Sequence, residues 1–321
     1  MSLHHHHGLF FAALAIFTIS VQAISTQSFS IPSISHMHKH KQWETFHNFT
    51  SCRLGQTQKG LSTVKNYLHR FGYIPHAPPT NFSDVFDETL VFAIRSYQKN
   101  YHLNITGKLD DNTVKHMMQP RCGVPDIIHT EKKDTTTGKQ IRSHFHMGSY
   151  YAFFDGNLRW PAGTKQLTYS FLPQNNVNND YKRAFARAFS RWAPWMPFSF
   201  KEITSNETAD IKIGFYKGDH GDGFPFDGPY NVLAHARPPI DGSFHLDAEE
   251  YWVASGDVTK SPVSRAIDLE SVAVHEIGHL LGLDHSNDKK SVMWPVLQTR
   301  TRRVNLGYDD IKGIKVLYAI K

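Results

Sequence analysis

The stretch His275-Glu276-Ile277-Gly278-His279-Leu280-Leu281-Gly282-Leu283-Asp284-His285 decides how the C-terminal half of this 321-residue chain folds. Positions i and i+4 share one face of a helix, so His275 and His279 present two imidazoles to one point, with Glu276 beside the first. Gly282 allows the chain to leave the helix sharply, which lets His285 return toward the same point. Three neutral imidazoles around one point predict a zinc site whose fourth position stays open.

An open position on zinc has a chemical consequence. Zinc lowers the pKa of a bound water to about 7. Glu276 would take the proton of that water, which attacks a carbonyl, and then deliver the proton to a leaving amine. Met293 follows His285 by eight residues and stands before Trp294-Pro295. A lone methionine is usually a core residue, but this spacing suits the Met-turn of the extended histidine motif, a soft hydrophobic floor beneath the histidines. The pattern therefore predicts hydrolysis of an amide bond.

The composition favours a packed globular protein of two domains, with 40% hydrophobic and 20% charged residues. The net charge is +6, but the basic residues are scattered and form no dense block of the kind that binds nucleic acid. A solvated basic surface is the simpler interpretation, and affinity for an acidic matrix or polysaccharide is the sharper one.

The N-terminus predicts export. The short apolar run 9–19 and the small-residue site Val21-Gln22-Ala23 indicate a signal peptide over residues 1–23. The run is too short to span a membrane, and no second apolar stretch of spanning length follows. The His4–His7 run is a purification tag, a native low-complexity feature or a metal site in a segment that is removed. Glycosylation sequons begin at Asn48, Asn81, Asn104 and Asn206. We expect a protein secreted to the extracellular space or the cell wall.

Hydrophobic spacing divides the rest of the chain. Three short helices are predicted within 57–118, where Pro120 follows the last. Residues 126–148 are polar and indicate a linker. Beyond it, the pattern predicts strands over 166–172, 198–203 and 211–216, helices over 181–192, 269–281 and 309–319, and a loop-rich stretch over 217–250. This is an α+β domain of ordinary size.

With Pro120-Arg121-Cys122-Gly123-Val124-Pro125-Asp126 added to the histidine motif, the sequence resembles the matrix metalloproteinases, or matrixins, of the metzincin clan. It is most similar to the short plant type, which has no hemopexin-like C-terminal domain. The resemblance covers nearly all of 52–321. It implies a metzincin catalytic domain over 149–321, with a twisted mixed five-stranded sheet and three helices. It also implies a propeptide over 24–148, which contains a three-helix, peptidoglycan-binding-like bundle at about 52–119 and a cysteine switch at 120–126.

The resemblance implies that Cys122 keeps the enzyme latent. A thiolate is a strong zinc ligand, so Cys122 would fill the fourth position and displace the water. Arg121 is expected to pair with an acidic group and hold the segment in place. Cys52 and Cys122 are the two cysteines, so one disulfide is arithmetically possible, and an unpaired buried cysteine is the plainer alternative.

The resemblance further implies structural ions in the stretch 217–250. A second, structural zinc is implied at His220, Asp222, His235 and His245, a set that satisfies tetrahedral coordination. Calcium is implied at Asp227, Asp247 and Glu250, with backbone carbonyls of Gly228, Tyr230 and Val232. Asp210 matches a ligand of a further calcium whose other partners are incomplete, since Ser243 stands where relatives commonly carry Asp. The plain alternative is a turn region rich in Gly, Asp and His.

Taken together, we expect a zinc metalloendopeptidase, a monomer, that cuts internal bonds of extracellular-matrix or cell-wall proteins and is inhibited by its own propeptide. The pocket for the residue after the scissile bond should lie beside His275, walled by 295–306. It should be deep and apolar because Ser271 is small. One alternative is a catalytically silent wall- or matrix-binding protein, and Glu276 argues against it because a structural zinc site needs no base. A second alternative is an astacin- or reprolysin-like protease, and the switch around Cys122 argues against it because those relatives lack that segment.

Overall fold

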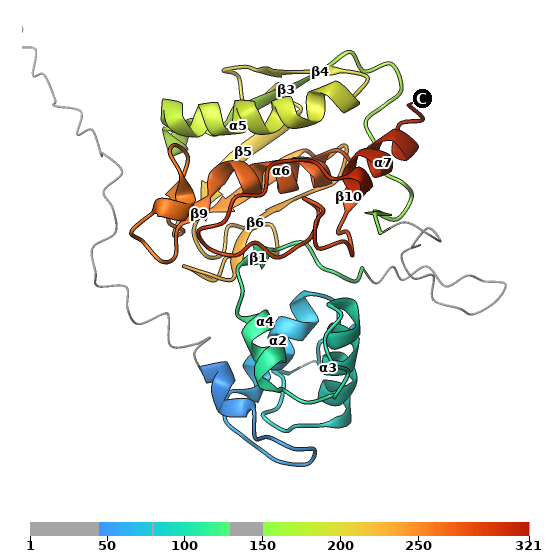
Figure 1. Cartoon of the computed structure of the whole chain (residues 1–321), viewed down its shortest axis with the longest axis vertical. Coiled ribbons are helices and arrows are strands. Elements are labelled where there is room, and N and C mark those ends of the chain that lie inside the picture. Colours follow the sequence, from blue (N-terminus) through green and yellow to red (C-terminus); the bar gives the residue numbers. More distant parts are fainter. Residues whose placement is uncertain (1–44, 79, 129–149, 321) are drawn as a thin grey trace, which may run out of the picture. The chain divides into compact units, whose positions relative to one another are not determined.

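The computed structural model describes residues 45–78, 80–128 and 150–320, so the predicted signal peptide and most of the predicted linker lie outside the described residues. The described part contains a helical bundle followed by an α+β domain (Figure 1). Within it, no helix combines the length and the apolar character needed to cross a membrane.

The bundle confirms the three predicted helices. They are α2 (Leu61–Arg70), α3 (Glu88–Asn100) and α4 (Asp111–Met117), preceded by the short 3₁₀ helix η2 (Thr45–Phe49). Asp87 and Asp110 cap α3 and α4 by accepting hydrogen bonds from the first-turn amides of Leu90 and Thr113. Buried aromatic side chains from η2, α2 and α3 fill the space between the helices.

The α+β domain is built on a mixed sheet, as the resemblance implies. Its five strands are β3 (Gln166–Phe171), β4 (Ser199–Glu202), β5 (Ile211–Tyr216), β6 (Val232–Ala236) and β7 (Ser243–Asp247). A sixth strand, β1 (Arg121–Cys122), joins the sheet from outside the domain, giving the order β1-β6-β7-β5-β3-β4. All neighbours are parallel except β6 and β7, which pair with His235 opposite His245.

The stretch 217–250, predicted to be loop-rich, also contains two strands that the hydrophobic pattern did not predict, β6 and β7. Every residue of β6 is buried, so the strand does not show the alternation of apolar and polar residues that marks a half-exposed strand. His235 and His245 also interrupt the apolar character of the two strands. Their position beside the centre of the sheet fixes both imidazoles in a rigid setting.

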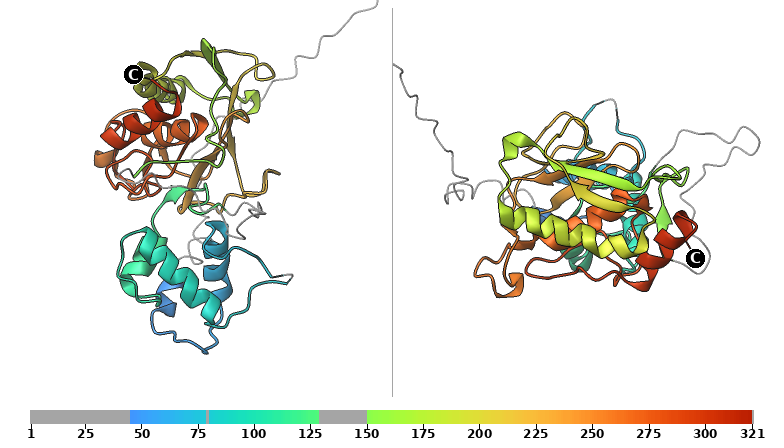
Figure 2. Two further views of the ribbon diagram at one scale, coloured as in Figure 1. Left: turned by 90° about the vertical axis from the view of Figure 1, so that its right-hand side faces the viewer. Right: turned by 90° about the horizontal axis from the view of Figure 1, so that it is seen from above.

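Two helices pack side by side against one face of the sheet: α5 (Asn179–Trp192) and α6 (Leu269–Leu280) (Figures 1 and 2). On α5, the apolar face predicted from the sequence contacts β3, β5 and β7 through Phe185 and Phe189. Every residue of α6 is buried. The third helix, α7 (Tyr308–Leu317), ends the domain. Short elements complete it: η3 (Pro173–Asn175), η4 (Ala193–Trp195), η5 (Val258–Lys260), and strands β2 (Ala152–Phe153), β8 (Trp252–Val253), β9 (Ile267–Asp268) and β10 (Leu283–Asp284).

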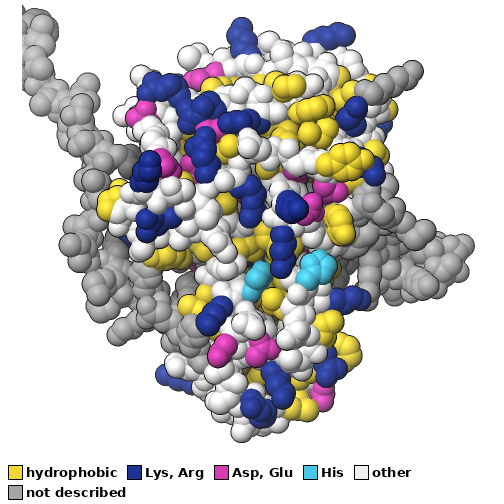
Figure 3. Space-filling model, in the orientation of Figure 1, with side chains coloured by type: hydrophobic (Ala, Val, Ile, Leu, Met, Phe, Trp, Pro, Cys, Tyr) yellow, Lys and Arg dark blue, Asp and Glu magenta, His cyan; other side chains and the backbone are white. Residues whose placement is uncertain are grey.

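On one face of the described part, basic side chains are dispersed rather than gathered in one block (Figure 3). On the face shown in Figure 3, Lys and Arg side chains are interspersed with acidic, apolar and neutral groups. Among the sequon asparagines, Asn48, Asn81 and Asn104 are exposed, whereas Asn206 is half-buried and accepts a hydrogen bond from Ser170.

Candidate active site and metal centres

The three histidines of the opening motif meet at one point. His275 and His279 lie one turn apart on α6, and their Nε2 atoms are 3.1 Å apart. Gly282 follows the helix with a φ of 101°, a left-handed conformation that glycine adopts without strain. A Cβ at this position would lie 2.1 Å from the carbonyl oxygen of Leu158. The sharp departure predicted from Gly282 is therefore confirmed, and it brings His285 back to the other two imidazoles.

Hydrogen bonds orient the imidazoles on α6 for metal binding. The Nδ1 of His275 lies 2.7 Å from the carbonyl oxygen of Val292, and the Nδ1 of His279 lies 2.8 Å from that of Leu283. Nδ1 donates in each case, which leaves Nε2 unprotonated and directed at the shared point. Burial lowers the pKa of His275 to about 3 and that of His279 well below its usual value, so both rings are neutral.

Cys122 completes the group. Its Sγ, the Nε2 atoms of His275 and His279 and a nitrogen of His285 all lie within 4.8 Å of one another. The distance from Sγ to the Nε2 of His279 is 3.5 Å, which agrees with the roughly 3.5 Å expected between thiolate and imidazole ligands of one tetrahedral zinc. The Nε2 of His285 is buried and has no hydrogen-bond partner. The donor set and its spacing therefore fit zinc.

Met293 packs against the helix that carries His275 and His279. It is 1% exposed, and a Cβ on Gly278 would come within 2.2 Å of its sulfur. Gly278 stands between His275 and His279 on α6, so a larger residue there would push Met293 away or bend the helix. The role of Gly278 was missed at the level of sequence, although its place inside the motif was the available signal.

Glu276 stands beside the metal-ligand group and is 1% exposed. Both carboxylate oxygens are buried, and the carboxyl group faces the Cys122 thiol and the backbone of Ala236. Burial raises the pKa of Glu276 to about 8. A carboxyl group whose pKa lies near neutral pH, close to a metal site, is suited to exchange protons with a substrate or a water.

The segment that carries Cys122 is held by the backbone on both sides. The amides of Arg121 and Gly123 donate to the carbonyls of Asn231 and Ala234 on one side, at 2.6 and 2.7 Å, and the Cys122 amide donates to Pro295 on the other, at 2.8 Å. These bonds make β1 a parallel neighbour of β6. The segment therefore occupies the edge of the sheet next to the histidines.

Arg121 finds its acidic partner in Asp126, in an ion pair whose side chains are each 1% exposed and whose closest atoms are 2.5 Å apart. Sequence reasoning missed the other contacts of Asp126. Its Oδ1 lies 3.1 Å from the Nδ1 of His285, and its Oδ2 accepts hydrogen bonds from Tyr73 and Tyr101 of the bundle. Asp126 thus connects the bundle to the third histidine.

The second predicted zinc set also comes together. A nitrogen of each of His220, His235 and His245 and an oxygen of Asp222 lie within 4.8 Å of one another. The Nε2 of His235 is 2.8 Å, and the Nδ1 of His245 3.0 Å, from the same Asp222 oxygen. Burial lowers the pKa of His235 to about 3. Phe226 stacks on His220 at 4.9 Å between ring centroids. Three imidazoles and one carboxylate are a donor set of the kind that closes a tetrahedral zinc site.

Three carboxylates lie in the stretch 217–250: Asp247 and Glu250 are buried and Asp227 is half-buried. Burial raises the pKa of Asp227 to about 6, that of Asp247 to about 7 and that of Glu250 well above its usual value. The Oδ2 of Asp247 and the Oε2 of Glu250 have no hydrogen-bond partner. Neighbouring carboxylates contribute to the raised pKa of Asp247 and Glu250. A cluster of carboxylates with oxygens that lack donors fits a hard cation such as calcium. Gly228 and Tyr230 have positive φ angles of 85° and 72°, and the chain turns there, directly after Asp227.

Asp210 has a different setting. Its Oδ2 accepts hydrogen bonds from the amide and the hydroxyl of Thr168, both at 2.7 Å. These bonds hold β3 beside the start of β5, so its observed contacts are structural.

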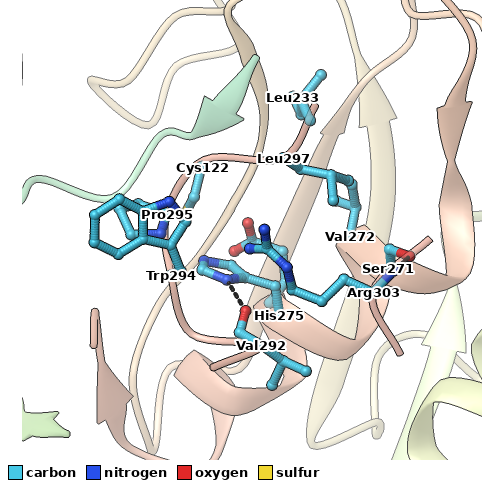
Figure 4. A pocket seen from close by; sticks show the side chains of 11 residues that line it. Cys122, Leu233, Ser271, Val272, His275, Val292, Trp294, Pro295, Leu297 and Arg303 are labelled. Atoms are coloured by element: carbon cyan, nitrogen blue, oxygen red, sulfur yellow. Dashed lines mark hydrogen bonds between the residues drawn. The ribbon is translucent and has the colours of Figure 1, made fainter. Parts of the chain in front are cut away.

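A pocket opens beside His275 where the resemblance placed it (Figure 4). Most of its lining is apolar, from Leu233, Val272, Val292, Trp294, Pro295 and Leu297. Ser271, Cys122 and Glu276 also line it. The prediction of an apolar pocket needs one correction, because Arg303 lines it as well and brings in a cation.

Comparison with known proteins agrees with this geometry. The sequence model of the matrixin family matches residues 159–319, and that of a peptidoglycan binding domain matches residues 57–117. The chain is 53% identical to Metalloendoproteinase 1 of Glycine max over 100% of this chain and 99% of that protein. It is 48% identical to Metalloendoproteinase 2-MMP of Arabidopsis thaliana over 86% and 75% of the two chains. It is 34% identical to neutrophil collagenase of Homo sapiens over 82% and 51%. The family match, the relatives and the histidine site together show that this chain belongs to the matrixins and is a zinc metalloendopeptidase.

Proposed function

We propose that the chain is the latent precursor of a secreted endopeptidase. Cys122 keeps the precursor inactive, and Glu276 is the general base of the mature enzyme. The position of Cys122 carries this proposal. Its Sγ lies within 4.8 Å of the ligand nitrogens of all three histidines, in the place that a catalytic site keeps for water and substrate. The assignment divides the chain into a signal peptide (1–23), a propeptide (24–148) and a catalytic domain (149–321).

The propeptide blocks the site in two ways. Cys122 supplies a fourth ligand, which leaves no position for water. In addition, β1 pairs with β6, the edge strand along which an extended substrate would otherwise add its own backbone. The ion pair between Arg121 and Asp126 holds the segment in this position.

Once the propeptide is removed, His275, His279 and His285 hold the zinc, which when bound supplies a Lewis acid and lowers the pKa of water. Glu276 accepts the proton of the attacking water and delivers it to the leaving amine. Met293 supports the histidines from below. The edge of β6 orients the substrate backbone, and the pocket beside His275 receives the side chain that follows the scissile bond.

The other ions are assigned to stability. His220, Asp222, His235 and His245 hold a structural zinc, and Asp227, Asp247 and Glu250 hold calcium with carbonyls of Gly228, Tyr230 and Val232. The export signal, the sequons and the family favour protein substrates in the extracellular matrix or the cell wall.

The test is cleavage of casein or gelatin by the full-length protein before and after proteolytic removal of residues 24–148. We expect no cleavage before removal, cleavage afterwards, and loss of cleavage when a chelator is added. A full-length protein as active as the processed one would contradict the proposal.

A further inference from the structure

Two adjacent arginines near the specificity pocket have different surroundings. Arg302 is neutralised: its Nη1 lies 3.1 Å from Asp268 and its Nη2 lies 2.7 Å from Glu270. Arg303 has no carboxylate within ion-pair distance among the residues that the structure describes, and its Nη1 donates to the carbonyl of Val296 at 3.1 Å. Arg303 is half-buried, and burial lowers its pKa from the usual value. Its cation is thus partly removed from water without an ion pair in return.

The backbone of Arg303 is fixed at the pocket. Its amide donates to the Oγ of Ser271 at 2.7 Å, and that hydroxyl donates to Asp268. Ser271 is one turn before His275 on α6, so this bond attaches the segment 295–306 to the helix that carries the zinc ligands. Ser271 and Arg303 both line the pocket, and the Arg303 side chain extends away from Ser271 toward His275 (Figure 4).

The surroundings of Arg303 leave its positive charge available to pair with an anionic group of a substrate. Asp310 is the carboxylate that acts on it electrostatically, but that group already accepts hydrogen bonds from Ser291, Val292, Met293 and Gly307. Arg303 and Trp294 also line a second hollow, whose lining includes Lys289 and Arg302 but no carboxylate. The Lys289 ammonium lies 5.7 Å from the centre of the Trp294 ring.

We propose that Arg303 makes this pocket select a substrate residue with an apolar stem and an anionic end, glutamate above all. The stem would contact Val272, Leu297 and the other apolar walls, while the carboxylate would pair with the guanidinium of Arg303. This inference rests on the proposed function, because it takes the pocket beside His275 as the site for the residue after the scissile bond.

The test uses the processed enzyme and peptides that differ only in the residue after the scissile bond: Leu, Gln, Glu or Lys. In the Arg303→Gln variant, we expect the ratio of kcat/KM for the Glu peptide to that for the Leu peptide to fall about tenfold, the effect of one partly buried ion pair. Arg303→Glu should reverse the charge preference and favour the Lys peptide. Arg303→Lys keeps the charge and should keep most of the ratio.

The matched control is Arg300→Gln. Arg300 is exposed, lies three residues away and uses its Nη2 to donate to the carbonyl of Thr259, so its loss should leave the ratio unchanged. An unchanged ratio in both Arg303→Gln and Arg303→Glu, with peptides still cleaved, would overturn the inference and leave the proposed function intact. If the processed wild-type enzyme cleaved none of the peptides with zinc bound, the proposed function itself would fail.

Discussion

The two metal-ligand groups of this protein have similar donors but different origins along the chain. The structural group takes all four ligands from residues 220–245, on one loop and two paired strands. The other takes three histidines from 275–285 and its fourth ligand, Cys122, from a segment more than 150 residues earlier. Under the proposed function, the site whose ligands all come from one domain would stay closed when the propeptide leaves. The site that takes its fourth ligand from the propeptide would open, and this difference would distinguish a structural ion from a catalytic one.

The largest difference between the two metal-ligand groups is expected from Glu276→Gln. Glu276 stands beside the catalytic group without being a ligand, and the group at 220–245 has no such carboxylate. We expect peptide hydrolysis by the processed enzyme to fall by roughly 10²–10⁴-fold, the usual contribution of a general base. Both zinc ions should remain, since Glu276 is not a ligand. The measurement is kcat/KM together with the zinc content per chain, and turnover close to wild type would rule out Glu276 as the base.

The Cys122→Ser variant removes the fourth ligand, the Cys122 thiol, from the group around His275, His279 and His285. A serine hydroxyl is a poor zinc ligand compared with a thiolate, so the full-length variant should cleave gelatin without processing. Cys52→Ser is the matched control, because Cys52 is also free and buried but lies near Gln58 in the bundle. It should remain latent. If Cys122→Ser were as silent as wild type, Cys122 would not be the switch.

Mutation of the metal-ligand group at 220–245 should lower the stability of the folded catalytic domain. His245→Ala removes a ligand held on β7, so the processed enzyme should lose one zinc and melt at a lower temperature, by roughly 5–10 °C for a cost of about 2–3 kcal/mol. His279→Ala should instead abolish activity. Zinc analysis and thermal unfolding of the two variants provide the comparison. Equal melting temperatures for His245→Ala and wild type would contradict a structural role for the metal-ligand group at 220–245.

The smallest effect is expected from Asp126→Asn, which weakens the attachment of the segment that carries Cys122 but keeps the thiol. The change breaks a buried ion pair with Arg121 and alters the contact with His285, so the latent form should open more often. Basal activity of the full-length protein should rise about tenfold, well below that of Cys122→Ser. Asp111→Asn, an exposed residue on α4, is the control that loses the same charge elsewhere. Basal activity equal to wild type would show that the ion pair is dispensable.

Much of the fold and of the candidate site could be predicted because the signals are local. The helical spacing of Leu61, Val64 and Leu68 marked α2, and the motif at 275–285 marked α6 together with the turn at Gly282. β6 was missed because all of its residues are buried, so the alternation of apolar and polar residues disappears. β7 keeps that alternation over only five residues, inside a stretch rich in Gly, Pro and Asp.

By itself the sequence determined which residues can act as ligands, since the i, i+4 spacing of His275 and His279 is a property of one helix. Only the tertiary structure decided what surrounds them. It placed Cys122 and Asp126 against the histidines, set β1 on the edge of β6, and put Arg303 into a pocket predicted to be apolar. These contacts join segments far apart in the chain, and the packing of whole elements, rather than any local pattern, determines which of them meet.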